Sequence, residues 1–215
     1  ISFTGSTATG RKVAESGGPS LKRVTLELGG NDAAIVLEDA KPLKIAEDIF
    51  NSAMANTGQI CAAIKRLYVH KDIYEEMCDA LKEIADSTIV GDGFEQGTDL
   101  GPLQNKQQYE KVKNYIEEAK EKGKVISGGE IPDKPGYFIP ITLIKDVEDG
   151  LSLVDEEQFG PVLPVIKFNE LDEVVEKANA SKYGLGGSVW SENTQVARDI
   201  AQKLQAGTVW VNQHA

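Results

Sequence analysis

The chain has 215 residues, of which 40% are hydrophobic, and its 34 acidic and 23 basic residues give a net charge of -11. This length and composition fit a globular protein of one or two domains with a proper core. The negative charge argues against general affinity for nucleic acid or for anionic membranes. No apolar run approaches the roughly 20 residues of a membrane-spanning helix.

Cys61 and Cys78 are the two cysteines of the chain. Two cysteines in a chain of this length suggest neither a disulfide framework nor a zinc site, so we expect no metal and a reducing compartment, the cytoplasm or an organelle lumen. Cys61 follows a Gly-Gln turn inside an apolar run. A buried structural thiol and a nucleophile activated by backbone dipoles or a base both fit this stretch. Cys78, one position off a helical apolar stripe, is expected to be structural.

The beginning of the chain predicts a strand, a turn and a helix over residues 6–15, which Gly17-Gly18-Pro19 ends. Such a turn directs free backbone N–H groups and the positive end of the helix dipole toward an anion above Gly5 and Ser6. Phosphate is the obvious candidate anion. A plain N-cap role for Ser6 remains the alternative.

Residues 21–28 alternate between apolar and polar side chains and predict a strand that Gly29-Gly30 ends. Glu27 therefore lies at the carboxyl end of a strand. Ligands of open α/β sheets bind at that end, although an exposed glutamate without a catalytic role is commoner there.

The remaining chain alternates between strand and helix patterns. Strands are predicted at 33–37, 67–69, 125–129, 139–145, 162–168, 185–190 and 207–212. Helices are predicted from Pro42, from about Asp72, over 107–122, after a cap at Asn169 and after a cap at Asn193. Residues 91–103 are rich in glycine and acid and predict a loop. This alternation predicts an α/β fold with parallel strand connections.

Four motifs occur in a fixed order along the chain: Phe3-Thr4-Gly5-Ser6 with Gly10, Leu26-Glu27-Leu28-Gly29-Gly30, Asn56-Thr57-Gly58-Gln59-Ile60-Cys61, and Glu156-Glu157-Gln158-Phe159-Gly160-Pro161-Val162. Together they resemble the aldehyde dehydrogenase superfamily. Gly101-Pro102-Leu103, Tyr183-Gly184-Leu185 and Gly207-Thr208-Val209-Trp210 fit the same resemblance. Four ordered motifs over the whole chain are far more specific than any one of them.

The resemblance implies a catalytic domain over residues 29–215, with a mostly parallel sheet flanked by helices and truncated at its C-terminus. Residues 1–28 would be the end of a Rossmann-like NAD(P)-binding domain. Members of the family are more than twice this long, so we expect a fragment with little or no dehydrogenase activity of its own. The full-length protein is expected to be a homodimer or a homotetramer.

The resemblance also implies a reaction, the oxidation of an aldehyde to a carboxylic acid with NAD or NADP. Cys61 would be the nucleophile that forms a thiohemiacetal and then a thioester. The backbone N–H of Cys61 and an asparagine outside this chain would hold the oxyanion. Glu27 would be the general base that activates the hydrolytic water.

Further residues are implied as cofactor contacts. Glycine and serine near the first helix would contact the phosphates, two residues after Glu27 would lie beside the nicotinamide, and three later residues would contact the ribose. The phosphate contacts would be Gly5, Ser6 and Gly10, and the nicotinamide contacts Leu28 and Gly29. The ribose contacts would be Lys111, Glu157 and Phe159. The position of Lys111 is inferred from a loosely patterned helix.

Two alternatives remain at this stage. One is a structural or binding protein on the same scaffold, which the intact Cys61 and Glu27 disfavour. The other is an acylating relative that passes the thioester to coenzyme A, and such relatives commonly lack the glutamate found here at Glu27. Enzymes for semialdehydes, betaine aldehyde and broad ranges of aldehydes share these motifs, so the sequence does not select the aldehyde.

Overall fold

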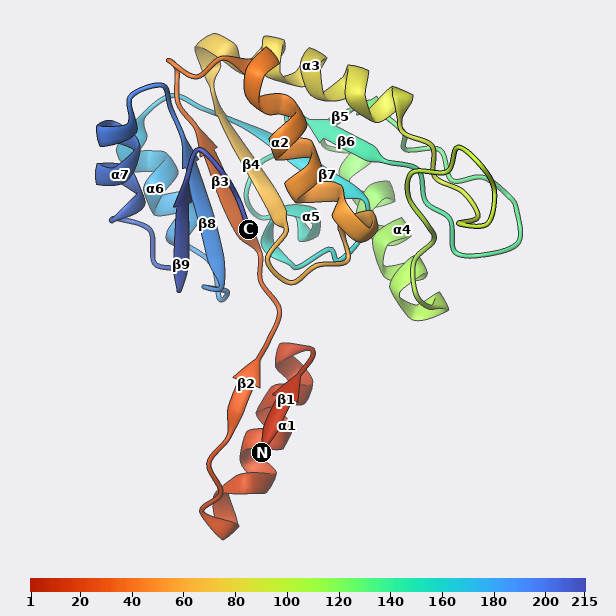
Figure 1. The fold of residues 1–215 in the computed structure, drawn as a ribbon, viewed down its shortest axis with the longest axis vertical. Helices are drawn as coiled ribbons and strands as arrows, with labels where there is room; N and C mark the ends of the chain where they lie inside the picture. The colour runs from red at the N-terminus through yellow and green to blue at the C-terminus, as the bar shows by residue number, and fades with distance from the viewer.

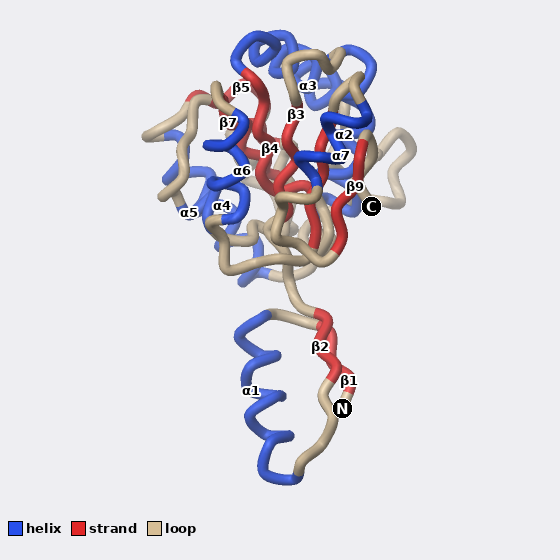
Figure 2. The backbone as a smooth tube through the Cα atoms, turned by 90° about the vertical axis from the view of Figure 1, so that its left-hand side faces the viewer, coloured by secondary structure: helices blue, strands red, loops and turns tan.

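The computed structural model describes residues 1–215, which form a small unit and a larger α/β body (Figure 1). The small unit contains a two-stranded sheet and the body a seven-stranded sheet. Residues 28–31 connect the two, and both views show the small unit standing apart from the rest of the molecule (Figure 2). No helix combines the length and the apolar character needed to cross a membrane.

The small unit is a strand-helix-strand element. Strands β1 (Ser2–Thr4) and β2 (Thr25–Glu27) pair in parallel, and helix α1 (Thr7–Gly17) with the 3-10 turn η1 (Gly18–Ser20) connects them. The predicted strand over 21–28 is therefore too long at its start. Leu21 has a left-handed backbone, with φ 51°, and is 93% exposed. A bulky residue in that conformation cannot continue a strand.

The sheet of the body has the strand order β5-β6-β7-β4-β3-β8-β9. All neighbouring strands are parallel except β5, which is antiparallel to β6. The predicted mostly parallel sheet is confirmed. Its strands are β3 (Asp32–Val36), β4 (Ile64–His70), β5 (Lys124–Ser127), β6 (Thr142–Lys145), β7 (Val162–Phe168), β8 (Gly186–Trp190) and β9 (Thr208–Val211).

Helices cover both faces of this sheet (Figure 1). Helices α2 (Pro42–Met54) and α3 (Tyr74–Ser87) pack on one face; the other is covered by α4 (Lys106–Lys120), α5 (Ser152–Asp155), α6 (Leu171–Asn179) and α7 (Thr194–Ala201). In β3, Ala34 and Val36 belong to the first core, whereas Ala33 and Ile35 belong to the second. Because both of its faces are buried, β3 is apolar at every position after Asp32.

Helix ends show which local signals were reliable. Asn193 caps α7 as predicted, because its Oδ1 accepts from the N–H groups of Gln195 and Val196 at 3.1 and 3.2 Å. The predicted cap at Asn169 is wrong: α6 begins at Leu171 with Glu170 at the cap position.

Cys78 is 2% exposed and packs in the core between the sheet and helices α2 and α3, as expected of a structural thiol. Burial raises its pKa to about 12.

Candidate active site

Three adjacent strands, β3, β4 and β7, bring the predicted site residues to one edge of the sheet. Gly29 precedes β3, Cys61 precedes β4 and Phe159 precedes β7, and parallel neighbours begin at the same edge. A cavity of about 530 Å³ opens there, between this edge and the small unit. It is lined from the small unit by Gly5, Ser6 and Glu27, from the connector by Leu28 and Gly29, and from the body by Cys61, Lys111, Glu157 and Phe159.

The chain before Cys61 has an unusual backbone. Asn56, Thr57 and Gly58 have φ values of 52°, 60° and 71°. A Cβ on Gly58 would lie 2.2 Å from the carbonyl oxygen of Gly160, so this close approach requires glycine. Thr57 donates its hydroxyl to the carbonyl of Gly101 at 2.9 Å. Strained backbone of this kind persists where the surroundings hold it, and it is concentrated at functional sites.

Cys61 lies at the corner of a turn that the N–H of Ala63 closes on the carbonyl of Ile60, at 3.2 Å. Its side chain is exposed at the cavity, whereas Cys78 is buried. Gln59 braces the entrance to the turn: its Nε2 donates to the carbonyl of Asn56 at 2.9 Å and its Oε1 accepts from the N–H of Gln104 at 3.0 Å. The thiol predicted to be the nucleophile is therefore accessible to a small molecule.

Glu27 lines the same cavity as Cys61, although the two belong to different sheets. It is the last residue of β2 and is exposed. Its carbonyl accepts from the N–H of Gly5 at 3.0 Å, which fixes the end of the strand beside the start of α1. A solvated carboxylate at the wall of a cavity that an exposed thiol also lines can take a proton from water or from the thiol.

Glu157 and Lys111 form a partly buried pair at the cavity wall. Oε1 of Glu157 accepts from the N–H of Gly30 at 3.1 Å, and Nζ of Lys111 donates to the carbonyl of Glu157 at 2.7 Å. Burial raises the pKa of the Glu157 carboxyl and lowers the pKa of the Lys111 amine. A Cβ on Gly29 would lie 2.2 Å from Oε2 of Glu157, so the backbone before β3 packs directly on this carboxylate.

Ser6 and Gly10 show how α1 is set against the cavity. The Ser6 hydroxyl accepts from the N–H of Thr9 at 3.3 Å, so the N-cap role is real, and Ser6 also lines the cavity. Gly10 is buried and does not line the cavity. A Cβ there would lie 2.5 Å from Cδ2 of Leu28, so Gly10 lets the helix approach the chain that leads to Gly29. Its predicted cofactor contact stays a prediction.

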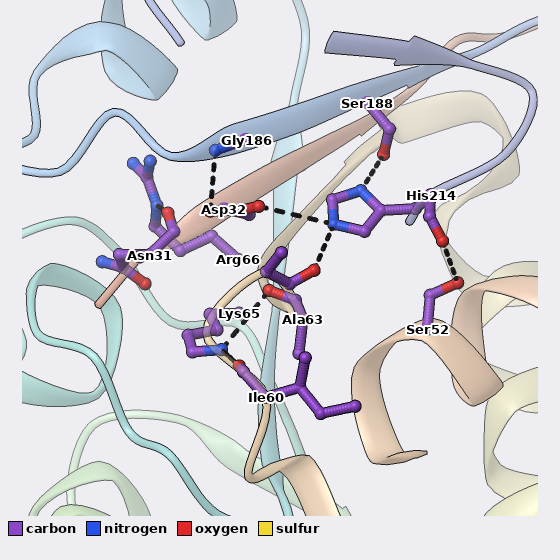
Figure 3. Close-up of polar contacts among 12 residues, drawn as sticks. Asn31, Asp32, Ser52, Ile60, Ala63, Lys65, Arg66, Gly186, Ser188 and His214 are labelled. Atoms are coloured by element: carbon purple, nitrogen blue, oxygen red, sulfur yellow. Dashed lines mark hydrogen bonds and ion pairs between the residues drawn. The ribbon is translucent and has the colours of Figure 1, made fainter. Parts of the chain in front are cut away.

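Sequence reasoning missed a group of buried polar side chains that contact the turn at residues 60–63 (Figure 3). Nζ of Lys65 donates to the carbonyl of Ile60 at 2.6 Å. Nε2 of His214 lies 3.0 Å from the carbonyl of Ala62 and 3.6 Å from Oδ2 of Asp32. Asp32 and His214 are far apart in the chain, and a lysine inside a strand pattern normally indicates an exposed face, so the sequence held no signal for this group.

The family model described as "Aldehyde dehydrogenase family" matches residues 1–215. Fold, motif order and cavity agree with that match, and the chain belongs to the aldehyde dehydrogenase family. It is 46% identical to the putative aldehyde dehydrogenase DhaS of Bacillus subtilis, over 99% of this chain and 43% of that protein. It is 42% identical to the phenylacetaldehyde dehydrogenase of Pseudomonas fluorescens, over 100% of this chain and 43% of that protein.

Solved structures show the same relationship. The NAD+ complex of an aldehyde dehydrogenase from Bacillus cereus superposes with a TM-score of 0.95 and 44% identity, over 100% of this chain and 44% of that chain. An NAD+ complex of a Mycobacterium tuberculosis aldehyde dehydrogenase superposes with a TM-score of 0.94 and 34% identity, over 100% and 45%. The chain thus spans less than half the length of these relatives.

Proposed function

We propose that the whole protein containing this chain oxidises an aldehyde to a carboxylic acid through a thioester on Cys61, with NAD or NADP as hydride acceptor. The observation that carries this proposal is the cavity at which an exposed thiol, an exposed carboxylate and the Lys111–Glu157 pair meet. Solved relatives that hold NAD+ support a nicotinamide cofactor. The cavity volume of about 530 Å³ and the start of α1 at its wall fit the end of a dinucleotide.

Each residue has a defined task in this reaction. The Cys61 thiolate attacks the aldehyde carbon, and the backbone N–H of Cys61 stabilises the developing oxyanion. A bound nicotinamide supplies the hydride acceptor. Glu27 then removes a proton from the water that hydrolyses the thioester. Lys111 and Glu157 orient the ribose, Phe159 packs against it, Leu28 and Gly29 bound the nicotinamide, and Gly5 and Ser6 face the phosphates.

The arrangement of the chain supports two further parts of the proposal. Residues 1–28 are the end of a cofactor-binding domain and residues 29–215 belong to the catalytic domain, since the two form separate sheets. The chain alone is expected to have little or no dehydrogenase activity, because its relatives are more than twice its length. Assembly as a homodimer or homotetramer and a cytoplasmic location complete the proposal.

The test uses the whole protein, an aldehyde panel and either NAD+ or NADP+, with NAD(P)H absorbance as the readout. Cys61→Ala is expected to abolish oxidation, whereas the matched variant Cys78→Ala keeps the activity. Glu27→Gln is expected to allow one rapid turnover of hydride and then to stall at the thioester. A flat trace with every aldehyde would contradict the proposal and favour a structural protein on the same scaffold.

The acylating alternative has its own readout. If coenzyme A is the acceptor, adding it to the wild-type protein releases acyl-CoA and restores turnover in Glu27→Gln. Exposed Glu27 at the cavity favours water as the acceptor instead. We expect free carboxylic acid as the product with or without coenzyme A.

A further inference from the structure

We propose that Lys65 is a positioning residue for the chemistry at Cys61. It donates to the carbonyl of Ile60 from the buried side of the turn, and this contact directs the N–H of Cys61 toward the cavity. It also places a positive charge close to the nucleophile. The inference rests on the proposed function, because it assigns a residue to the oxyanion site of that reaction. Lys65 does not line the cavity and acts only through the turn formed by residues 60–63.

Lys65 is unusual for its burial. It is 2% exposed, although lysine is almost never fully buried without a partner. Its Nζ donates to two main-chain carbonyls of the turn, that of Ile60 at 2.6 Å and that of Ala63 at 3.5 Å (Figure 3). It also lies 5.9 Å from the ring centre of Phe159. A buried ammonium group with backbone carbonyls as its hydrogen-bond partners fixes the backbone that carries those carbonyls.

Because of peptide geometry, this contact also sets the direction of the N–H of Cys61. The chain has no cis peptide bonds, and in a trans peptide unit the C=O and the N–H point in opposite directions. The Ile60 carbonyl and the Cys61 N–H belong to one such unit. Because Lys65 holds the carbonyl on the buried side, the N–H is directed to the opposite side, where the Cys61 thiol faces the cavity.

A second buried contact keeps the turn from rotating. Nε2 of His214 lies 3.0 Å from the carbonyl of Ala62, and Nδ1 of His214 lies 2.9 Å from the hydroxyl of Ser188 (Figure 3). The carbonyls on both sides of Cys61, those of Ile60 and Ala62, are therefore held by buried side chains. A turn fixed at both ends keeps its N–H donors in place as charge develops, which is the condition for stabilising an oxyanion.

Charge gives Lys65 an effect that a neutral donor lacks. Lys65 is electrostatically coupled to Glu157, to Asp32 and to Cys61. Burial lowers the pKa of Lys65, and these acidic groups partly oppose that effect. A cation beneath Cys61 favours the thiolate before attack and the oxyanion after it, and it strengthens the N–H donor by polarising the peptide.

The first experiment measures the rate of NADH formation in a single turnover of the whole protein. Lys65→Met removes donor and charge, Lys65→Gln keeps a donor without charge, and Lys65→Arg keeps the charge. We expect Met and Gln to slow the turnover by about 10- to 100-fold, with KM for NAD+ changed less than about 2-fold, and Arg to restore part of the rate. Lys44→Met, at an exposed lysine of α2, is the control for net charge.

The second experiment separates this inference from the proposed function. The chain carrying Cys78→Ala is treated with iodoacetamide at pH 7 without cofactor, and alkylation of Cys61 is followed by mass spectrometry. We expect Lys65→Met and Lys65→Gln to slow alkylation by about 10-fold relative to Lys44→Met, since a neighbouring cation promotes the thiolate. This result, together with a whole protein that oxidises no aldehyde of the panel, would overturn the proposed function and keep Lys65 as an electrostatic neighbour of Cys61. Equal alkylation rates would overturn the inference.

A measurement on the unsubstituted chain covers the case in which the Lys65 variants do not fold. The carbonyl carbon resonance of Ile60 is expected to change along the same pH curve as the Lys65 side-chain resonances, because one hydrogen bond joins the two groups. Glu157, Asp32 and Cys61 also face Lys65 and are followed in the same titration. An Ile60 carbonyl that does not respond to Lys65 overturns the inference.

Discussion

At Gly58, the chain that leads to Cys61 lies so close to the loop before β7 that no residue with a side chain would fit. The left-handed backbone of Gly58 and the short distance to Gly160 are two separate reasons for glycine at this position. Gly160 in turn packs on Val112 of α4, where a Cβ would lie 2.5 Å from Cγ2. The position of the nucleophile thus depends on contacts between backbones and small residues, and polar side chains contribute from behind.

We expect Gly58→Ala to lower the free energy of unfolding by about 3 kcal/mol, because a Cβ would both strain the backbone and collide with the Gly160 carbonyl. Urea unfolding measures this change. Gly93→Ala is the matched control, since a Cβ there has nothing within 4 Å and φ is not positive. Similar stabilities of the two variants would show that the loops separate easily.

Lys65 gives a pH prediction. Its pKa is lowered in the folded protein mainly by burial, from an ordinary value of 10.5, so above the folded pKa the unfolded chain binds more protons than the native one. Stability linked to Lys65 is therefore present above pH 10.5 and is lost as the pH falls through the folded pKa. We expect the stability of the wild type relative to Lys65→Met to rise between pH 7 and pH 10.5 in urea unfolding experiments. A constant difference would show that the buried amine is not destabilised in its charged form.

Among the elements, α4 shows how a single cap affects the site. Helix α4 carries Gln108 and Lys111 to the cavity wall, and Asn105 caps it by accepting from the N–H of Gln108 at 2.9 Å. We expect Asn105→Ala to destabilise the protein by about 1 kcal/mol. Asn169→Ala is the control, because Asn169 precedes α6 without capping it, and we expect a change within about 0.5 kcal/mol. Thermal unfolding compares the two variants.

The elements also show what the sequence can reveal. The strand predicted over 162–168 coincides with β7, because a strand buried on both faces has an apolar run that local patterning detects. The motifs predicted that Cys61 and Glu27 share a site, and both residues line one cavity. Lys65 escaped prediction because its neighbours Ile64 and Arg66 give no sign that it is buried. Burial of a polar side chain depends on partners far away in the chain, which a local pattern does not contain.

At the scale of the whole molecule, the last residues of the chain reach back to the site. His214 is 4% exposed and lies beside Asp32, whose Oδ2 is buried without a hydrogen-bond partner. It also lies against Trp210, with ring centres 4.8 Å apart. This contact links the end of the chain to the beginning of β3 and to the turn at Cys61.

We expect His214→Phe to lower the free energy of unfolding by about 3 kcal/mol, because it removes the imidazole that contacts the Ala62 carbonyl, the Ser188 hydroxyl and the buried Asp32 carboxylate. Adding Asp32→Ala to His214→Phe is expected to recover part of that loss, and a double-mutant cycle in urea measures the coupling. Additive effects of the two substitutions would mean that the 3.6 Å contact carries no interaction energy.

The short connector between the two sheets has a consequence for ligand affinity. Residues on both sides of residues 28–31 line one cavity, so a molecule bound there contacts the small unit and the body at once. A ligand that contacts both parts binds more weakly when the parts are displaced from their observed arrangement. By thermodynamic linkage, bound ligand favours the observed arrangement by the same free energy. A substitution in the connector that shifts the relative position of the two parts therefore alters the dissociation constant of the ligand without touching it.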